Sequence, residues 1–326
     1  MKETIKDMFK GKTVLVTGGT GSFGKKFTEI ALKYGRPKKL IIFSRDEMKQ
    51  YEMRKEFHQE NIRYFIGDVR DADRLHRAFH GVDTIIHAAA LKIVPAGEYD
   101  PFEVVKTNII GAENVINIAI DNGVKQVVAL STDKAVNPIN LYGATKLCAE
   151  KMFISANNYS PFGTKFSVVR YGNVIGSRGS VVPLFKECAA TGTIPVTDRR
   201  MTRFWMTLEE GVRFVLSSLR QMKGGEIFIP KIPSMKITDL ARALAPHCQI
   251  KTIGIRPGEK LHEILITDDD ARYTVDCPDR YIIYPEVVYG RRKKIAGKKL
   301  PGGFEGYRSD NNTAWLSVKE LHHLVS

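Results

Sequence analysis

The chain has 326 residues, of which 43% are hydrophobic and 26% charged, with a formal net charge of +14. These values indicate a globular protein of one large domain or two modest ones, and no run of about 18 apolar residues predicts a membrane span. Because no nucleic-acid motif accompanies the positive charge, we expect anionic small-molecule ligands and no nucleic-acid partner. The cysteines are far apart, which argues against a metal site or a disulfide framework and suits a cytoplasmic protein.

Short apolar strands alternate with helical stretches over the first half of the chain. Strands are predicted at 13–17, 40–43, 63–67, 83–87, 126–130 and 166–170, with helices that include 46–58, 102–122 and 142–157. This alternation is typical of βαβ units around a parallel sheet that is buried on both faces. We therefore predict an α/β fold with a Rossmann-like, doubly wound parallel sheet.

The composition changes after about residue 172, where Gly, Pro and Arg become frequent. We predict a Rossmann domain over 1–172, followed by a smaller C-terminal substrate-binding lobe over 173–326. The segment 205–230 is expected to return to the first domain, because much of it has a helical pattern. Ligands of such folds lie at the carboxyl ends of the strands, so we expect the lobe to close over them.

The first strand runs into the glycine-rich stretch TGGTGSFG. Two of its glycines allow a tight turn and a close approach to a pyrophosphate, and the third lets the following helix pack against the strand. The amides at the start of that helix then face the phosphates. A glycine-rich turn without a ligand is the alternative, but the strand and helix around it favour a dinucleotide site. The candidate residues are Gly18, Thr20, Gly21, Ser22, Phe23 and Gly24.

The second strand ends at Ser44, Arg45 and Asp46. An acidic residue at this strand tip suits the ribose 2′-hydroxyl of NAD, whereas an arginine suits the 2′-phosphate of NADP. Because Ser44 and Arg45 come first, we favour NADP. Asp46 is also a candidate N-cap of the next helix, and the alternative interpretation of Arg45 is a solvated residue at the start of that helix. Asp68 and Val69, after the third strand, are placed to contact the adenine.

Tyr142 and Lys146 form a Tyr-x-x-x-Lys pair at the start of a predicted helix. Residues four apart lie on one helix face, so the ammonium is expected to lower the pKa of the phenol. The tyrosine can then exchange a proton with a substrate hydroxyl while hydride moves to a nicotinamide. Such a pair also arises by chance on helices, but here it lies downstream of a dinucleotide-type loop.

The motifs TGGTGSFG, FIGDVRD, HAAALK, TDK and YGATK occur in the order found in extended short-chain dehydrogenases/reductases that modify nucleotide sugars. The stretches SRDE, ALSTDKAVNPINLYGATKLCAEK, VVRYGNVIGSRGSVVPLF, MTRFW, IFIPKIPSMKITDLA and IGIRPGEKLHE narrow this resemblance. Nearly the whole chain resembles the 5-inverting UDP-N-acetylglucosamine 4,6-dehydratases that open the pseudaminic acid route. Retaining relatives carry transmembrane helices and often have methionine in place of the tyrosine, which Tyr142 argues against.

The resemblance implies a lyase reaction on UDP-N-acetylglucosamine. Oxidation at C4, with Tyr142 as base, acidifies the C5 proton, and water is then eliminated before hydride returns to C6. By resemblance, Thr132 polarises the 4-oxygen, Asp133 is the acid and Lys134 is the base. Lys134 must be neutral part of the time, which requires desolvation or nearby cations. The product would be UDP-2-acetamido-2,6-dideoxy-β-L-arabino-hexos-4-ulose. A salt-bridged loop pair is the alternative interpretation of Asp133 and Lys134.

The resemblance also implies binding residues. For the cofactor these include Ala88, Ala90, Lys92 and Asn108, together with Tyr142 and Lys146. For the substrate they are Lys92, Asn173, Val181, Thr197, Met201, Arg256, Glu259, Asn311 and Asn312. Arg256 is the first choice for the diphosphate, because its fork makes paired bonds to phosphate oxygens. Loop asparagines are more often turn formers, and Met201 is equally compatible with a core position.

Two residues differ from the pattern of the resembled family, and two alternative functions remain to be considered. The resembled family has histidine where this chain has Ile93, and Gly97 follows nearby, so we expect the local loop to differ from the family pattern. A UDP-N-acetylhexosamine 4-epimerase would share the cofactor loop and the Tyr142–Lys146 pair, but not the acid and base. An NADP-sensing module without enzymatic activity would not need the tyrosine. The helices 102–122 and 142–157 resemble those that pair in this superfamily, which predicts a homo-oligomer.

Overall fold

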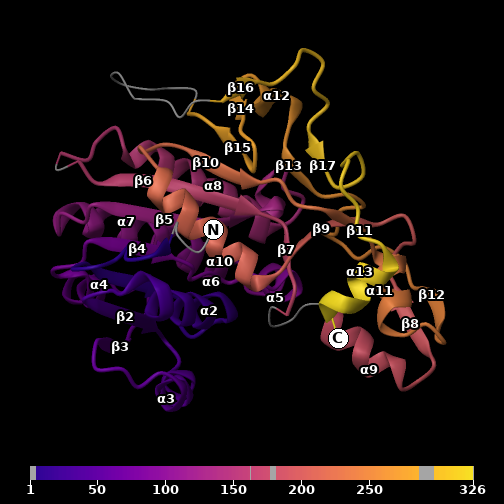
Figure 1. Cartoon of the computed structure of the whole chain (residues 1–326), viewed down its shortest axis with the longest axis horizontal. Helices are drawn as coiled ribbons and strands as arrows, with labels where there is room; N and C mark the ends of the chain where they lie inside the picture. The colour runs from indigo at the N-terminus through magenta and orange to yellow at the C-terminus, as the bar shows by residue number, and fades with distance from the viewer. Residues whose placement is uncertain (1–4, 162, 177–180, 286–296, 326) are drawn as a thin grey trace.

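A ten-stranded sheet forms the centre of the protein (Figure 1), in the strand order β16-β14-β15-β10-β6-β5-β4-β1-β2-β3. The computed structural model describes residues 5–161, 163–176, 181–285 and 297–325. The strands of the parallel part are β1 (Thr13–Thr17), β2 (Lys39–Ser44), β3 (Ile62–Ile66), β4 (Thr84–His87), β5 (Gln126–Thr132), β6 (Lys165–Tyr171) and β10 (Ile227–Pro230).

The direction of strand addition reverses beside β1. β2 and β3 add to one side of it, whereas β4, β5 and β6 add to the other, with Leu15 opposite both Ile41 and Ile85. All five residues of β1 are buried, as expected for a strand covered on both faces. The predicted fold class is confirmed, and the reversal between β1 and β4 is the point at which such sheets bind ligands.

Helices cover both faces of the sheet. One core contains Phe27, Met53 and Val215, from α2 (Ser22–Ile30), α3 (Glu47–Glu56) and α10 (Leu208–Gln221). The other contains Leu75, Val115 and Phe153, from α4 (Ala72–Phe79), α7 (Gly111–Asp121) and α8 (Leu141–Ala156). The shorter helical segments are η1 (Ala31–Gly35), α5 (Val94–Tyr99), α6 (Pro101–Val105), η2 (Lys106–Ile110) and η3 (Asp133–Ala135).

The sheet continues beyond the expected Rossmann strands. β15 (Arg280–Ile283) pairs antiparallel with β10, and β14 (Thr274–Asp276) and β16 (Lys298–Lys299) follow it. The sequence analysis had assigned these residues to the lobe, because the strands are too short to show a pattern. α10 lies against α2, so this part of the segment 205–230 does return to the sheet.

The remaining elements form what we call the second lobe, of which α9, β8, α11, β12 and α13 lie to the right in Figure 1. They are β7 (Asn173–Val174), α9 (Val181–Ala189), β8 (Thr193–Val196), β9 (Thr202–Met206), β11 (Ser234–Lys236), α11 (Ile237–Leu244), β12 (Gln249–Thr252), β13 (Ile264–Ile266), α12 (Asp268–Ala271), β17 (Tyr307–Arg308) and α13 (Val318–Val325). Phe185, Leu240 and Leu321 belong to its separate core. Within the described residues, no helix has the length and apolar character needed to cross a lipid bilayer.

Candidate active site

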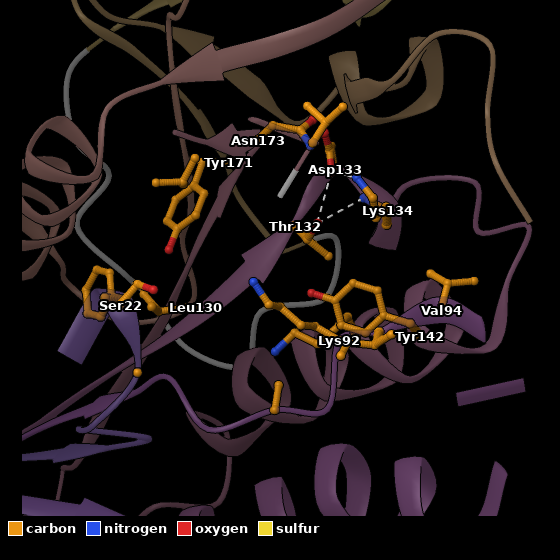
Figure 2. A pocket seen from close by; sticks show the side chains of 18 of the residues that line it. Ser22, Lys92, Val94, Leu130, Thr132, Asp133, Lys134, Tyr142, Tyr171 and Asn173 are labelled. Atoms are coloured by element: carbon orange, nitrogen blue, oxygen red, sulfur yellow. Dashed lines mark hydrogen bonds and ion pairs between the residues drawn. The ribbon is translucent and has the colours of Figure 1, made fainter. Parts of the chain in front are cut away.

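A cavity of about 1140 Å³ lies between the carboxyl ends of the parallel strands and the second lobe. The loops that follow β1 to β5 supply one wall, and residues of α9, β9 and the 256–263 segment supply the other. It therefore lies where the topology of the sheet predicts a ligand. Figure 2 shows the Lys92, Tyr142 and Tyr171 side chains directed into this space.

The glycine-rich loop shapes one end of the cavity. Gly18 has a φ of 65°, and a Cβ on it would lie 2.9 Å from the Ala88 carbonyl oxygen. Gly21 is the N-cap of α2 and has no side chain to accept hydrogen bonds from the amides of the first turn. These features leave a backbone cradle at a helix N-terminus, which fits the pyrophosphate of a dinucleotide.

The tip of β2 forms the next part of the wall. The Asp46 carboxylate accepts a hydrogen bond from the Lys49 amide at 2.9 Å and pairs with the Lys49 ammonium, so it is the N-cap of α3. The Ser44 hydroxyl accepts from the Gln50 side chain at 3.2 Å. Arg45 remains half exposed, with its guanidinium 3.5 Å from the Asp68 carboxylate. A cation, rather than a carboxylate, is thus the group most available to a ribose substituent here.

The helix that carries Tyr142 and Lys146 begins one residue before the predicted start, at Leu141. The Asn140 side chain accepts from the Gly143 amide at 2.8 Å and donates to the Gly258 carbonyl at 2.8 Å, which caps α8 and ties it to the second lobe. A Cβ on Gly143 would lie only 2.1 Å from the Lys134 carbonyl oxygen. The glycine between the tyrosine and the lysine therefore lets η3 pack directly on α8 and brings the two parts of the candidate site together.

Tyr142 and Lys146 both line the cavity, but their electrostatics differ from the prediction. Burial raises the pKa of Tyr142 to about 12, against the opposing effects of the Lys134 ammonium and the Thr132 hydroxyl. Burial also lowers the pKa of Lys146 to about 8, which the Glu150 carboxylate only partly offsets. The expected lowering of the tyrosine pKa is therefore wrong for this structure, because loss of hydration outweighs the neighbouring cations.

Thr132, Asp133 and Lys134 form one hydrogen-bonded group (Figure 2). The Thr132 hydroxyl donates to Asp133 Oδ1 at 2.9 Å, and the Lys134 ammonium lies 3.0 Å from the same oxygen. Asp133 is fully buried, and its Oδ2 has no hydrogen-bond partner within the described part of the chain. Burial first, and then the Glu263 carboxylate, raise the pKa of Asp133. A buried carboxyl that tends to keep its proton is suited to act as an acid.

Glu263 is the main site residue that the sequence analysis did not identify. Its Oε1 lies 3.2 Å from the Lys134 ammonium and 3.7 Å from Arg203 Nε, and only 3% of its side chain is exposed. Although burial acts to lower the pKa of Lys134, the Asp133 and Glu263 carboxylates raise it above its ordinary value. The motifs MTRFW and RPGEKLHE contain Arg203, Lys260 and Glu263. These motifs indicate the family, but they do not indicate which of their side chains lie in the site.

Most predicted binding residues line this cavity. Those from the Rossmann part are Gly18, Thr20, Gly21, Ser22, Phe23, Ser44, Arg45, Asp46, Asp68, Val69, Ala88, Ala90 and Lys92. Those from the second half of the chain are Asn173, Val181, Thr197, Met201, Arg256 and Glu259. Met201 is also 2% exposed and belongs to the core of the second lobe, so it is both a cavity-lining residue and a core residue.

Four predicted binding residues lie outside the lining. The Asn108 side chain forms hydrogen bonds with the Leu91 backbone and the Thr145 hydroxyl. These bonds fix the loop after β4. The Asn311 and Asn312 side chains form hydrogen bonds with backbone groups, and Asn312 also donates to the Ser234 hydroxyl. Such bonds are typical of asparagines in turns. Gly24 serves packing alone, since a Cβ there would lie 2.2 Å from the Gly19 carbonyl oxygen.

The two departures from the family pattern have different settings. Ile93 lines the cavity at the N-cap position of α5 and is 63% exposed. Gly97 is buried within α5, where a Cβ would lie 3.1 Å from the Val104 side chain. Gly97 therefore allows close packing beside α6, whereas Ile93 adds an apolar edge to the cavity.

Comparison with known proteins agrees with this arrangement. The sequence profile of a family described as "Polysaccharide biosynthesis protein" matches residues 14–285. The chain belongs to this family. A Campylobacter jejuni protein named UDP-N-acetylglucosamine 4,6-dehydratase (inverting) is 56% identical over 98% of each chain. The membership that the motifs predicted is therefore confirmed.

Two further relatives bear on fold and function. The X-ray structure of Pen from Bacillus thuringiensis matches 97% of this chain and 98% of that chain, with a TM-score of 0.89 and 41% identity. A Rickettsia conorii protein named UDP-glucose 4-epimerase is 42% identical and matches 98% of this chain and 96% of that protein. Relatives with different named activities thus share this fold, so the activity has to be argued from the side chains.

Proposed function

We propose that this protein is an inverting UDP-N-acetylglucosamine 4,6-dehydratase. The observation that carries the proposal is the buried group of Asp133 and Lys134 in the same cavity as Tyr142 and Lys146. A tyrosine and a lysine suffice for reversible oxidation at C4, whereas elimination of water also requires an acid and a base. The name and high identity of the Campylobacter jejuni relative support the same substrate and stereochemistry.

The cofactor we propose is NADP. When bound, it would accept a hydride from C4 of the sugar and return it to C6. The glycine cradle at Gly18 and Gly21 would hold its pyrophosphate, and the half-exposed Arg45 would pair with its 2′-phosphate. Asp46 favours NADP for a second reason, because its carboxylate is occupied in capping α3. Lys146, buried beside the cavity, would contact the nicotinamide ribose.

Side chains of the protein would then carry out the proton transfers of the reaction. Tyr142 would accept the proton of the 4-hydroxyl, with the Thr132 hydroxyl close to the same oxygen. Once C4 is a ketone, Lys134 would remove the C5 proton and Asp133 would protonate the departing 6-hydroxyl, which leaves as water. The Asp133 and Glu263 carboxylates hold the Lys134 ammonium charged, so its proton has to leave before elimination begins.

The lobe side of the cavity suits a nucleoside diphosphate sugar. Arg256 is exposed in the wall, and Lys260 and Arg203 add two more cations close by. Planar guanidinium groups bind phosphate oxygens in pairs, which supports Arg256 as the diphosphate contact. Lys92, Asn173, Val181, Thr197 and Glu259 remain proposed contacts to the sugar and the nucleoside. The proposed homo-oligomer is supported by the 77% exposed Phe102 on α6, and sedimentation of the purified protein would test it.

The proposal is tested by proton NMR of the purified protein with UDP-N-acetylglucosamine in deuterated water, without added cofactor. We expect a new C6 methyl signal, deuterium at C5 and the coupling pattern of the L-arabino 4-keto sugar. This product is the kind of precursor that a pseudaminic acid route consumes. A methyl signal with the D-xylo pattern would retain the dehydratase and refute inversion.

An epimerase is the second candidate, supported by the Rickettsia conorii relative. It would yield UDP-N-acetylgalactosamine with the 6-hydroxyl retained, and no methyl signal would appear in the same spectrum. Absence of any product with a bound dinucleotide would instead favour a sensing module.

A further inference from the structure

The Lys134 ammonium lies between two carboxylates, and only one of them belongs to the acid–base pair described above. Lys134 Nζ is 3.0 Å from Asp133 Oδ1 and 3.2 Å from Glu263 Oε1. Asp133 is fully buried and Glu263 is 2% exposed as a residue. One ammonium therefore pairs with two buried carboxyl groups. Two negative charges beside one positive charge are energetically unfavourable where there is little water.

The outer oxygens of both carboxyl groups lack partners. Asp133 Oδ2 and Glu263 Oε2 are buried and make no hydrogen bond among the described residues. A buried carboxylate oxygen without a donor is destabilised, whereas a protonated one carries no charge. The geometry thus favours a proton on one of the two carboxyl groups, and the ammonium bridge offers a short path between them.

Glu263 is held in place by its backbone. Its amide donates to the Ser309 hydroxyl at 2.9 Å, and its carbonyl accepts from the Ser309 amide at 2.8 Å. Arg203 and Lys260 also face its carboxylate, and together with Lys134 they lower its pKa against the effect of burial. Lys92 and Tyr142 are also close enough to Lys134 for its charge to act on their pKa values in the lowering direction. Glu263 is the acidic group among these that the proposed reaction has not yet used.

We propose that Glu263 is a positioning residue whose negative charge keeps the acid proton on Asp133. This inference rests on the proposed dehydratase function. Glu263 stays ionised between Lys134, Arg203 and Lys260, and Lys134 gives its surplus proton to solvent before elimination begins. A neutral amine, a carboxylic acid and the Glu263 carboxylate then stand together.

The elimination then balances. The amine electron pair of Lys134 takes the C5 proton, the C5–H electrons form the C5=C6 bond, and the C6–O electrons leave with the oxygen. Asp133 gives its proton to that oxygen, and water departs. The group ends with Asp133 ionised, Lys134 charged and Glu263 still ionised, so elimination leaves its total charge unchanged. The substrate has lost one water, and no additional reactant is required.

Replacement of Glu263 by glutamine separates the steps of the reaction. Glu263→Gln keeps the size of the side chain but carries no charge to hold the acid proton on Asp133, so we expect formation of the C5-deuterated 4-keto-6-methyl sugar to fall about 10²-fold or more. Oxidation at C4 needs neither Glu263 nor Lys134 as a base, so reduced nicotinamide should still form in a single turnover. Its absorbance, followed beside the methyl signal, reports this difference.

The pH profile of turnover distinguishes this role from a structural one. Without the Glu263 charge, Asp133 loses its proton at lower pH because a repelling carboxylate is gone. Lys134 also becomes neutral at lower pH, because an attracting carboxylate is gone. Both limbs of the profile should therefore move to lower pH in Glu263→Gln. Glu263→Asp restores a carboxylate and should return the limbs towards the wild-type positions.

A matched control is available in Glu226→Gln. Glu226 is also buried, at 1% exposure, and accepts from Ser167 Oγ at 2.7 Å and the Gly224 amide at 2.9 Å, outside the cavity lining. We expect this variant to lose stability but to keep the wild-type pH profile. Wild-type turnover with an unshifted profile in Glu263→Gln would overturn the inference, as would equal losses in Glu263→Gln and Glu263→Asp without any shift. If wild-type protein forms no methyl sugar, the proposed function fails instead.

Discussion

The contact between Gly143 and Lys134 predicts that one methyl group would disable the site. In Gly143→Ala the new Cβ would lie 2.1 Å from the Lys134 carbonyl oxygen, whereas real Cβ atoms essentially never approach closer than 3.0 Å. α8 and η3 must therefore separate by about 0.9 Å, since the atom in the way belongs to the backbone. Overpacking of this kind costs about 1–3 kcal/mol of stability. A displacement of about 1 Å between reacting groups costs about 10²-fold in rate, so we expect a loss of that order.

Gly211→Ala is the matched control, because it also adds a methyl group to a helical glycine. A Cβ there meets only the Met206 side chain at 3.9 Å, so α10 should become more stable by about 0.5–1 kcal/mol with unchanged turnover. Urea denaturation and formation of the C6 methyl signal measure the two effects. Wild-type turnover in a folded Gly143→Ala variant would refute the argument that this packing aligns Tyr142 with Lys134.

Three further changes test other parts of the site. Lys146→Met should abolish turnover yet stabilise the protein at pH 7 by about 3 kcal/mol, since the folded pKa of about 8 lies below the ordinary value of 10.5. That gain should shrink as pH rises from 8 towards 10.5, where the unfolded lysine also becomes neutral, and denaturation at several pH values checks the sign. Arg45→Ala should weaken binding of NADP⁺ about tenfold or more while binding of NAD⁺ changes little, as measured by titration calorimetry. Arg170→Met leaves the 2% exposed Glu150 without its 2.7 Å partner and should cost about 3–5 kcal/mol in urea denaturation, most of which Arg170→Met with Glu150→Leu should restore.

Local patterns in the sequence predicted the parts of the site that are built locally. The apolar run of β1 and the glycines after it specify a strand, a turn and a helix within a few residues of one another. Tyr142 and Lys146 share a helix face for the same reason. Asp46 as the N-cap of α3 was equally readable, because a cap is defined by its own helix.

The remaining contacts depend on residues far apart in the chain. Lys134 and Glu263 are 129 positions apart, and no local pattern links them. The pKa of Tyr142 depends on how deeply the whole cavity buries it, which spacing along a helix does not determine. Asn108 was assigned to the cofactor from resemblance, whereas its hydrogen bonds to the Leu91 backbone, 17 positions away, became visible only in the structure.

The pairing of β13 with β17 has a consequence for synthesis of the protein on the ribosome. The strand–glycine–helix segment of residues 13–30 emerges early, and N-terminal parts of a chain generally fold first. Ser309, which anchors the backbone of Glu263, is translated only after every strand of the parallel part of the sheet. The parallel part can therefore form while the wall beside Lys134 is still open, and the pairing of β13 with β17 closes that wall last.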